Sequence, residues 1–205
     1  MKKFFFIFLL FLGNAAIAQR NTQEKLDASN ISSIRIESDE VFLVSVKTAP
    51  VSEISIRTHS EGEYFDNILL NSKVINGELV LSSEYPEILS GGYDKLSAHK
   101  VFSLEIEMEI PENMELNVTS NIASLVAEGN FKAVYANLKQ GYCHLLDFSG
   151  AAAVNTYDGD ILVKTNTGTI EASSRHGKVE TPDFLAGRNL LKLTSIDGNI
   201  KVLMN

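Results

Sequence analysis

The chain has 205 residues, a formal net charge of −8 and 44% hydrophobic residues, a composition that is too apolar for a disordered protein and ordinary for one or two globular domains. The acidic balance argues against binding to a nucleic-acid backbone, which requires clustered lysine and arginine. A single cysteine excludes an intramolecular disulfide framework and any zinc or iron–sulfur site built from several cysteines.

The first 18 residues have the pattern of a bacterial secretory signal peptide. Two lysines open the chain, residues 4–12 form an unbroken apolar run, and residues 16–18 (Ala-Ile-Ala) match a cleavage site before Gln19. A membrane anchor is the alternative, but this run is shorter than the roughly 20 residues that span a bilayer core. We therefore expect export to the periplasm, the outer cell surface or the extracellular space, with no transmembrane segment in the mature chain.

Residues of about 26–118 alternate between apolar and polar side chains, which predicts short β-strands. In residues 102–110 every second residue is apolar, while Glu105, Glu107 and Glu109 point the other way. Further strands are expected at 34–36, 41–46, 54–57, 73–75, 78–81 and 116–118. Asn76-Gly77 supplies the positive φ values of a type I′ turn and predicts a hairpin.

Two features of this region allow a functional and a structural interpretation. The three glutamates could bind calcium, but hard cations need six to eight converging oxygens, so a solvated sheet face is the simpler interpretation. The segment 82–100 contains Tyr85 and Tyr93, which could contact a ligand, but a loop that caps the end of the sheet is the simpler interpretation.

The second half carries an internal repeat of nine residues, marked by glycine. The repeat glycines are Gly141, Gly150, Gly159, Gly168 and Gly177, followed at ten and eleven residues by Gly187 and Gly198. Apolar residues stand two positions after most of them: Cys143, Ala152, Ile161, Ile170, Val179 and Ile200. Short strands joined at glycine corners, where positive φ is tolerated, predict a β-solenoid in which two or three repeats close one coil. Cys143 falls in an inward column and should be a buried, unreactive thiol.

The repeat resembles the x-G-x-I/V pattern of an adhesin-like domain family of exported bacterial envelope proteins of unknown function. The resemblance rests on Asp158-Gly159-Asp160-Ile161, Thr167-Gly168-Thr169-Ile170, His176-Gly177-Lys178-Val179 and Asp197-Gly198-Asn199-Ile200. Residues 94–100 and 109–113 also resemble segments that precede the repeats in that family, so the match spans roughly residues 30–205. It implies a β-helical fold and an envelope location, and it brings no established catalytic residues.

Other chemistries fit the sequence less well. A calcium-binding β-roll needs paired glycines and repeated aspartates, whereas Thr169 and Lys178 stand where Asp160 would have to recur. A glycan-cleaving β-helix needs carboxylates and a base that converge on one face. The candidates for such a site are Asp158, Asp160, Arg175, His176, Asp183 and Asp197. If two repeats close a coil, Asp158 and His176 should stack at the same edge. The four histidines, His59, His99, His144 and His176, are too dispersed to indicate zinc.

The sequence thus predicts an all-β chain in which a strand-rich region (about 26–118) runs without a linker into a single-stranded, right-handed β-helix or β-solenoid with about nine residues per side (about 119–205). Residues 1–18 would be the signal peptide and residues 19–205 one adhesin-like domain. We expect a non-catalytic envelope or surface protein without cofactor or metal, whose partner is an unknown envelope protein or a surface glycan and not a nucleic acid. A glycan-binding or glycan-cleaving β-helix protein is the alternative.

Overall fold

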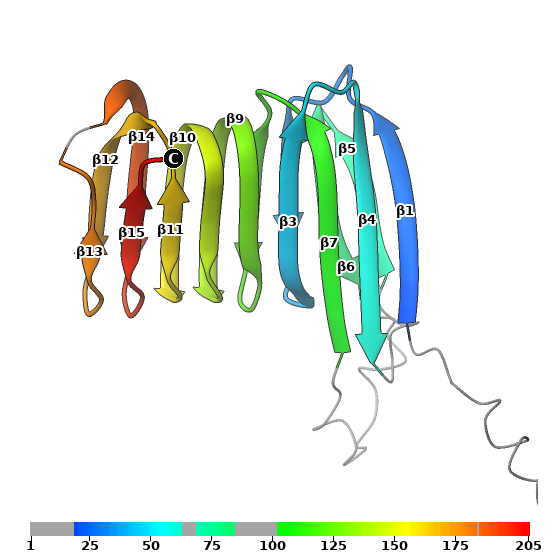
Figure 1. Cartoon of the computed structure of the whole chain (residues 1–205). Helices are drawn as coiled ribbons and strands as arrows, with labels where there is room; N and C mark the ends of the chain where they lie inside the picture. The colour runs from blue at the N-terminus through cyan, green and yellow to red at the C-terminus, as the bar shows by residue number, and fades with distance from the viewer. Residues whose placement is uncertain (1–18, 63–68, 85–101, 184) are drawn as a thin grey trace, which may run out of the picture.

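The computed structural model describes residues 19–62, 69–84, 102–183 and 185–205, and these residues form strands and turns only (Figure 1). The all-β prediction is therefore confirmed. The strands are β1 (Gln19–Asp27), β2 (Ser33–Glu37), β3 (Val41–Ala49), β4 (Glu53–Gly62), β5 (Leu69–Ile75), β6 (Glu78–Glu84), β7 (Phe102–Pro111), β8 (Glu115–Ser120), β9 (Ser124–Gln140), β10 (Cys143–Asp158), β11 (Ile161–Lys164), β12 (Thr167–Ser174), β13 (Val179–Glu180), β14 (Ala186–Ser195) and β15 (Ile200–Leu203). Within the described ranges no helix is long and apolar enough to cross a membrane.

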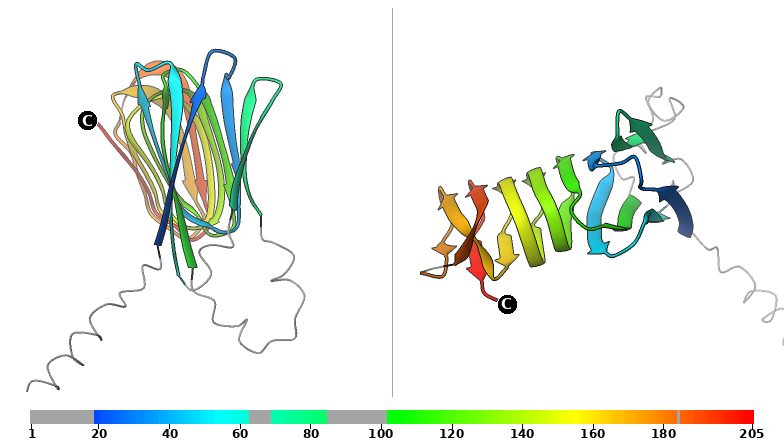
Figure 2. Two further views of the ribbon diagram at one scale, coloured as in Figure 1. Left: turned by 90° about the vertical axis from the view of Figure 1, so that its right-hand side faces the viewer. Right: turned by 90° about the horizontal axis from the view of Figure 1, so that it is seen from above.

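The strands lie in two layers that face each other across the core (Figure 2). We call layer A the strands in the order β1-β4-β7-β3-β9-β10-β11-β15-β13. Layer B has the order β5-β6-β2-β8-β9-β10-β14-β12. The long strands β9 and β10 belong to both layers, because their first halves pair in layer A and their second halves in layer B.

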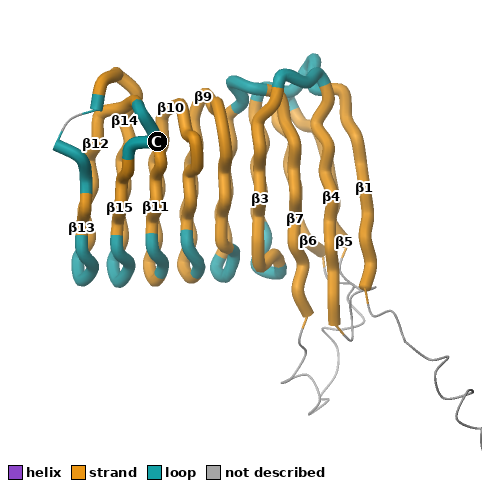
Figure 3. Tube along the Cα trace, viewed as in Figure 1, coloured by secondary structure: helices purple, strands orange, loops and turns teal. Residues whose placement is uncertain are grey.

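Parallel pairing joins residues that are 18 positions apart in the sequence. Cys143 pairs with Leu125 on one side and with Ile161 on the other, and Ala152 pairs with Val134. One passage through both layers therefore takes two nine-residue repeats. The trace bends within β9 and β10 at one edge and turns through loops at the other (Figure 3).

Three turns of the loop edge have the form Ser/Thr-x-x-Gly, namely residues 156–159, 174–177 and 195–198. In residues 174–177 the Ser174 hydroxyl accepts a hydrogen bond from the Gly177 N–H at 2.9 Å and donates one to the Gly198 carbonyl of the adjacent turn at 2.7 Å. The turn of residues 195–198 repeats the first contact, with the Gly198 N–H donating to Ser195 at 2.8 Å. The hydroxyl therefore fixes its own turn and holds the neighbouring turn at the same time.

Close approach between turns explains three of the repeat glycines. A Cβ on Gly159, Gly177 or Gly198 would collide with a glycine carbonyl of the neighbouring turn. These three residues do not adopt positive φ, so the expected reason for glycine is wrong for them. It holds at Gly141, Gly150 and Gly168, where φ is 94°, 139° and 144°.

Columns of inward side chains fill the space between the layers. One column of layer A contains Val44, Leu125, Cys143, Ile161 and Ile200, each of which is buried completely or almost completely. The prediction that Cys143 is a buried free thiol is confirmed. Burial raises the pKa of this thiol to about 12, so the group stays neutral at physiological pH.

Val179, which the repeat places in the same inward column, is 41% exposed. This strand, β13, ends the order of layer A, so no further strand covers it. The expectation of an inward, buried column is therefore wrong at the last position of the stack.

The last two strands do not follow chain order. β14 lies between β10 and β12, and β15 lies between β11 and β13. The inward residues of the inserted strands are large and fully or almost fully buried: Leu191, Leu193, Ile200 and Val202. The strands displaced to the end carry Ala172 and Val179 at matching positions, so the more apolar pair occupies the place that is covered on both sides.

The first half of the chain continues the same two layers. β3 pairs with β9, and β2 pairs with β8. The predicted hairpin is confirmed, because β5 and β6 are antiparallel and Asn76 and Gly77 have φ values of 52° and 81°. The strand β1 was not predicted, since it is a polar edge strand held by β4 and lacks apolar alternation.

Replacement of a stacked glycine should destabilise the protein. In Gly159→Ala the new Cβ collides with a backbone carbonyl that cannot move without shifting a whole turn, so we expect a loss of about 1–3 kcal/mol in the free energy of unfolding. Urea denaturation followed by circular dichroism measures this loss. Lys164→Ala, an exposed change on the adjoining strand β11, serves as the control. An unchanged midpoint for Gly159→Ala would contradict the stacking of these turns.

The thiol of Cys143 should react only when the protein unfolds. The thiolate is the reactive species, and complete burial both blocks access and raises the thiol pKa to about 12. At pH 8 we expect labelling by iodoacetamide to be at least about a hundredfold slower in buffer than in 8 M urea, measured by mass spectrometry. Equal rates under the two conditions would show that this inward column is not closed.

Candidate functional site

Two of the four predicted ligand-site residues, Tyr85 and Tyr93, lie outside the described residues, as does His99. The other two, Asp158 and His176, are exposed and lie at the loop edge. They are not neighbours, because the inserted strand β15 places the turn with Asp197 between them. His176 Nδ1 bonds the Asp197 carboxylate at 2.5 Å instead. The 18-residue spacing therefore placed Asp158 and His176 at the correct edge, but the prediction that they stack on each other is wrong.

Two of the remaining candidates for metal or calcium binding, Asp160 and Glu107, are engaged in local contacts. Asp160 Oδ1 accepts the Asn199 N–H at 2.7 Å, which holds two adjacent turns together. In the glutamate row of β7, Glu107 faces Arg57 at 3.6 Å, a neighbour that disfavours a bound cation. In the described part of the chain no group of three or more His, Cys, Asp or Glu side chains is placed to hold a metal ion.

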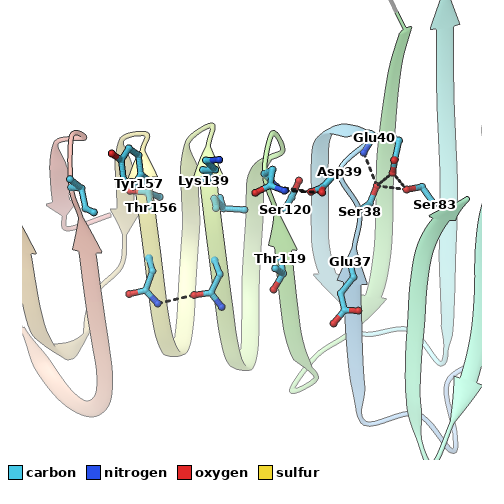
Figure 4. A pocket seen from close by; sticks show the side chains of 15 residues that line it. Glu37, Ser38, Asp39, Glu40, Ser83, Thr119, Ser120, Lys139, Thr156 and Tyr157 are labelled. Atoms are coloured by element: carbon cyan, nitrogen blue, oxygen red, sulfur yellow. Dashed lines mark hydrogen bonds between the residues drawn. The ribbon is translucent and has the colours of Figure 1, made fainter. Parts of the chain in front are cut away.

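A groove of about 780 Å³ follows the loop edge on the side of layer B (Figure 4). One wall is a row of outward side chains on the strands of layer B: Glu37, Thr119, Asn137 and Asn155. The other wall consists of turn residues two positions later: Asp39, Asn121, Lys139, Tyr157 and Ile196. The floor between them is the row of inward residues whose hydroxyls cap the turns: Ser38, Ser120 and Thr156 with Leu138.

The walls belong to a regular backbone, which fixes their spacing. Thr119, Asn137 and Asn155 are 18 residues apart, and parallel pairing places them side by side. The Asn155 side-chain amide donates to Asn137 Oδ1 at 3.0 Å. These polar residues were not predicted as a site, although their 18-residue spacing is visible in the sequence and was the signal that could have found them.

At the end of the groove nearest the N-terminal strands, the three carboxylates of Glu37, Asp39 and Glu40 all form hydrogen bonds or ion pairs with other residues of the chain. Asp39 accepts hydrogen bonds from both the backbone N–H and the side-chain amide of Asn121, at 2.9 and 2.8 Å. Glu40 accepts hydrogen bonds from the hydroxyls of Ser38 and Ser83.

Glu37 is the third of these carboxylates, and it lies 3.2 Å from the Arg35 guanidinium. Hydrogen bonds to Glu78 and then to Glu37 raise the pKa of Arg35, which therefore stays charged. These carboxylates thus act as parts of the scaffold.

The other end of the groove is aromatic and apolar. Tyr157 is 53% exposed although it belongs to a rigid turn, and Ile196 lies beside it on the adjacent turn. Lys139 stands one turn closer to the acidic end and is the single cation in the lining that the structure describes. The groove can therefore offer amides, a hydroxyl, one ammonium group and one aromatic ring to a ligand.

Comparison with solved structures finds a protein with the same fold. A "putative cell adhesion protein" from Clostridium sporogenes superposes with a TM-score of 0.64 at 11% identity, over 91% of this chain and 100% of that chain. The two chains share a fold. A "putative adhesin" from Bacteroides fragilis (TM-score 0.37, 13% identity, 90% of this chain and 97% of that one) and another from Parabacteroides distasonis (0.29, 10%, 90% and 97%) add nothing to this at such scores.

No protein-family model matches the sequence, and a search of curated proteins finds no match. At 11% identity the likeness to the Clostridium protein concerns the fold alone.

His144, on the outer face of layer A, should titrate below the ordinary histidine pKa of 6.5. Partial burial beside the Tyr142 ring lowers its pKa, Asp160 opposes this, and Lys164 adds to it. Because the unfolded chain then binds more protons between the lowered pKa and 6.5, this group makes stability fall as the pH drops through that interval. An NMR titration measures the pKa directly. In Asp160→Asn it should fall further, and a wild-type value at or above 6.5 would contradict the burial of the ring.

Proposed function

We propose that the chain is an exported, non-catalytic protein of the bacterial cell envelope or surface, an adhesin-like β-solenoid that binds its partner through the groove along the loop edge. The signal-peptide pattern of residues 1–18 supports export. The observation that carries the proposal is the groove itself: an open channel of about 780 Å³ whose two walls are fixed by the stacking of the strands.

The arrangement of the strands supports the solenoid as the finer description of the fold. Parallel pairing at an offset of 18 residues corresponds to a coil with two sides of about nine residues. Connections between parallel strands are almost always right-handed, so we assign the coils a right-handed twist. The inserted strands β14 and β15 are the departure from a simple stack.

The lining of the groove favours binding over catalysis. Hydrolysis of a glycan needs one carboxylic acid and one carboxylate on opposite sides of the bond that is cleaved. The three carboxylates of the groove lie together at one end and are bound to Ser38, Arg35 and Asn121. Asp158 and His176 are likewise separated by the turn that carries Asp197.

Export is tested by expressing the full chain in a diderm bacterium and sequencing the N-terminus of the fractionated product. We expect a periplasmic or surface-associated protein that begins at Gln19, because residues 16–18 provide the cleavage site. Ala18→Lys should block processing and leave a larger product. Accumulation of the uncleaved wild-type chain in the cytoplasm would contradict the proposal.

Binding is tested with the processed protein, incubated with envelopes isolated from the bacterium that encodes it and sedimented. We expect retention that falls at least about fivefold in Tyr157→Ala, since this ring is the most exposed large hydrophobic side chain in the groove. Tyr142→Ala removes an exposed tyrosine that lies between β9 and β10 outside the groove, and it is the matched control. Equal retention of both variants and the wild type would exclude the groove as the binding surface.

A further inference from the structure

We infer that the ligand of the groove is a neutral polysaccharide that lies along the stacking axis and contacts successive turns with successive sugar units. This inference rests on the proposed function, because it names the partner of the same groove. Four properties of the groove carry it: its direction, its hydrogen-bonding groups, its aromatic end and its charge.

The direction comes from the repeat. The groove crosses the turns of Asp39, Asn121, Lys139, Tyr157 and Ile196 in that spatial order. Neighbouring strands of a sheet lie about 4.8 Å apart, so these turns extend over about 19 Å. The length of one pyranose unit in an extended glycan is close to the strand spacing, which gives a sugar polymer and the wall the same period.

The hydrogen-bonding groups match a ligand rich in hydroxyls. Within the described part of the chain, Asn155 uses its amide nitrogen on Asn137, which leaves Asn155 Oδ1 as an acceptor and Asn137 Nδ2 as a donor with no protein partner. Thr119 adds a hydroxyl in the same row one strand away. Alternating donors and acceptors at strand spacing suit sugar hydroxyls, which both donate and accept.

The aromatic end provides a stacking surface. The Tyr157 ring projects from a turn whose backbone is fixed by the Thr156 hydroxyl, which donates to the Gly159 carbonyl at 2.7 Å. A ring held in this way can pack against the apolar face of a pyranose without losing much side-chain freedom. Ile196 on the next turn extends the apolar contact.

The charge of the groove excludes anionic polymers. Three carboxylates and one lysine line it, and the whole chain has a net charge of −8. A phosphate backbone or an acidic polysaccharide would be repelled at the carboxylate end.

The strands that form the first wall also disfavour an extended peptide. β2, β8, β9 and β10 are each paired on both sides, so they offer no free backbone edge to a peptide strand. A neutral glycan remains the ligand that the lining fits.

The decisive experiment repeats the envelope sedimentation with envelopes treated in two ways. Periodate cleaves the vicinal diols of sugars, and proteinase K removes protein partners. We expect periodate to abolish retention and proteinase K to leave it within about twofold. Retention that survives periodate and is lost after proteinase K overturns the glycan inference, while binding at the groove, and with it the proposed function, still stands. Absence of retention on untreated envelopes overturns both.

The chemical class is then tested with glycans released from the same envelopes and separated by anion exchange into neutral and anionic pools. Affinity electrophoresis should show retardation by the neutral pool, reduced about tenfold in Tyr157→Ala and about threefold in Asn137→Ala. Tyr142→Ala should migrate as the wild type does. Retardation by the anionic pool alone, or by the neutral pool with equal strength in all variants, overturns the inference.

Discussion

At the loop edge of the stack, adjacent turns approach so closely that a glycine carbonyl of one occupies the position of a Cβ on the next. In two of these turns an inward hydroxyl also satisfies the backbone. Ser195 accepts the Gly198 N–H at 2.8 Å, and Ser174 donates to the Gly198 carbonyl at 2.7 Å. With a Cβ on Gly159, Gly177 or Gly198 a turn would have to move away from its neighbour, and without the Ser195 hydroxyl the Gly198 N–H would lose its partner. The close approach of these turns therefore depends on their glycines.

Regular spacing at the edge explains why the groove has straight walls. Once each turn takes the same form, residues 18 positions apart fall side by side, as Asn137 and Asn155 do. The side chains that point outward do not take part in core packing, because the inward residues of the same strands fill the core. The Tyr157 ring is exposed for this reason while its neighbour Thr156 is buried. A binding surface therefore needs no special loops on this scaffold.

Alternation and glycine period predicted the strands, the inward column and the buried Cys143, since these depend on local geometry and on a repeat of constant length. The hydroxyl three residues before the glycine was missed, although Thr156, Ser174 and Ser195 all stand there. The role of this hydroxyl can be predicted only when the neighbouring turn is known, because the hydroxyl also contacts that turn. The insertion of β14 and β15 could not be predicted from the period, because the repeat implies stacking in chain order. The inner residues of β14 are larger than Ala172 of β12 and are buried on both sides, an advantage that exists only when two placements of the strands compete. The neighbours of each turn depend on the same insertion, which explains why Asp158 and His176 were paired wrongly.

These constraints also explain how another protein can share the fold over 91% of this chain at 11% sequence identity. Glycine or another small residue at the corner, a hydroxyl three positions earlier and apolar residues at alternate positions suffice to define the stack. All of these point inward or lie at the edge. The outward rows, which include Thr119 and Asn137, are free of these demands, so they can diverge without cost to the fold. Likeness of fold therefore carries no information about the ligand in this architecture, and the identity of the partner must be read from the outward rows of each chain.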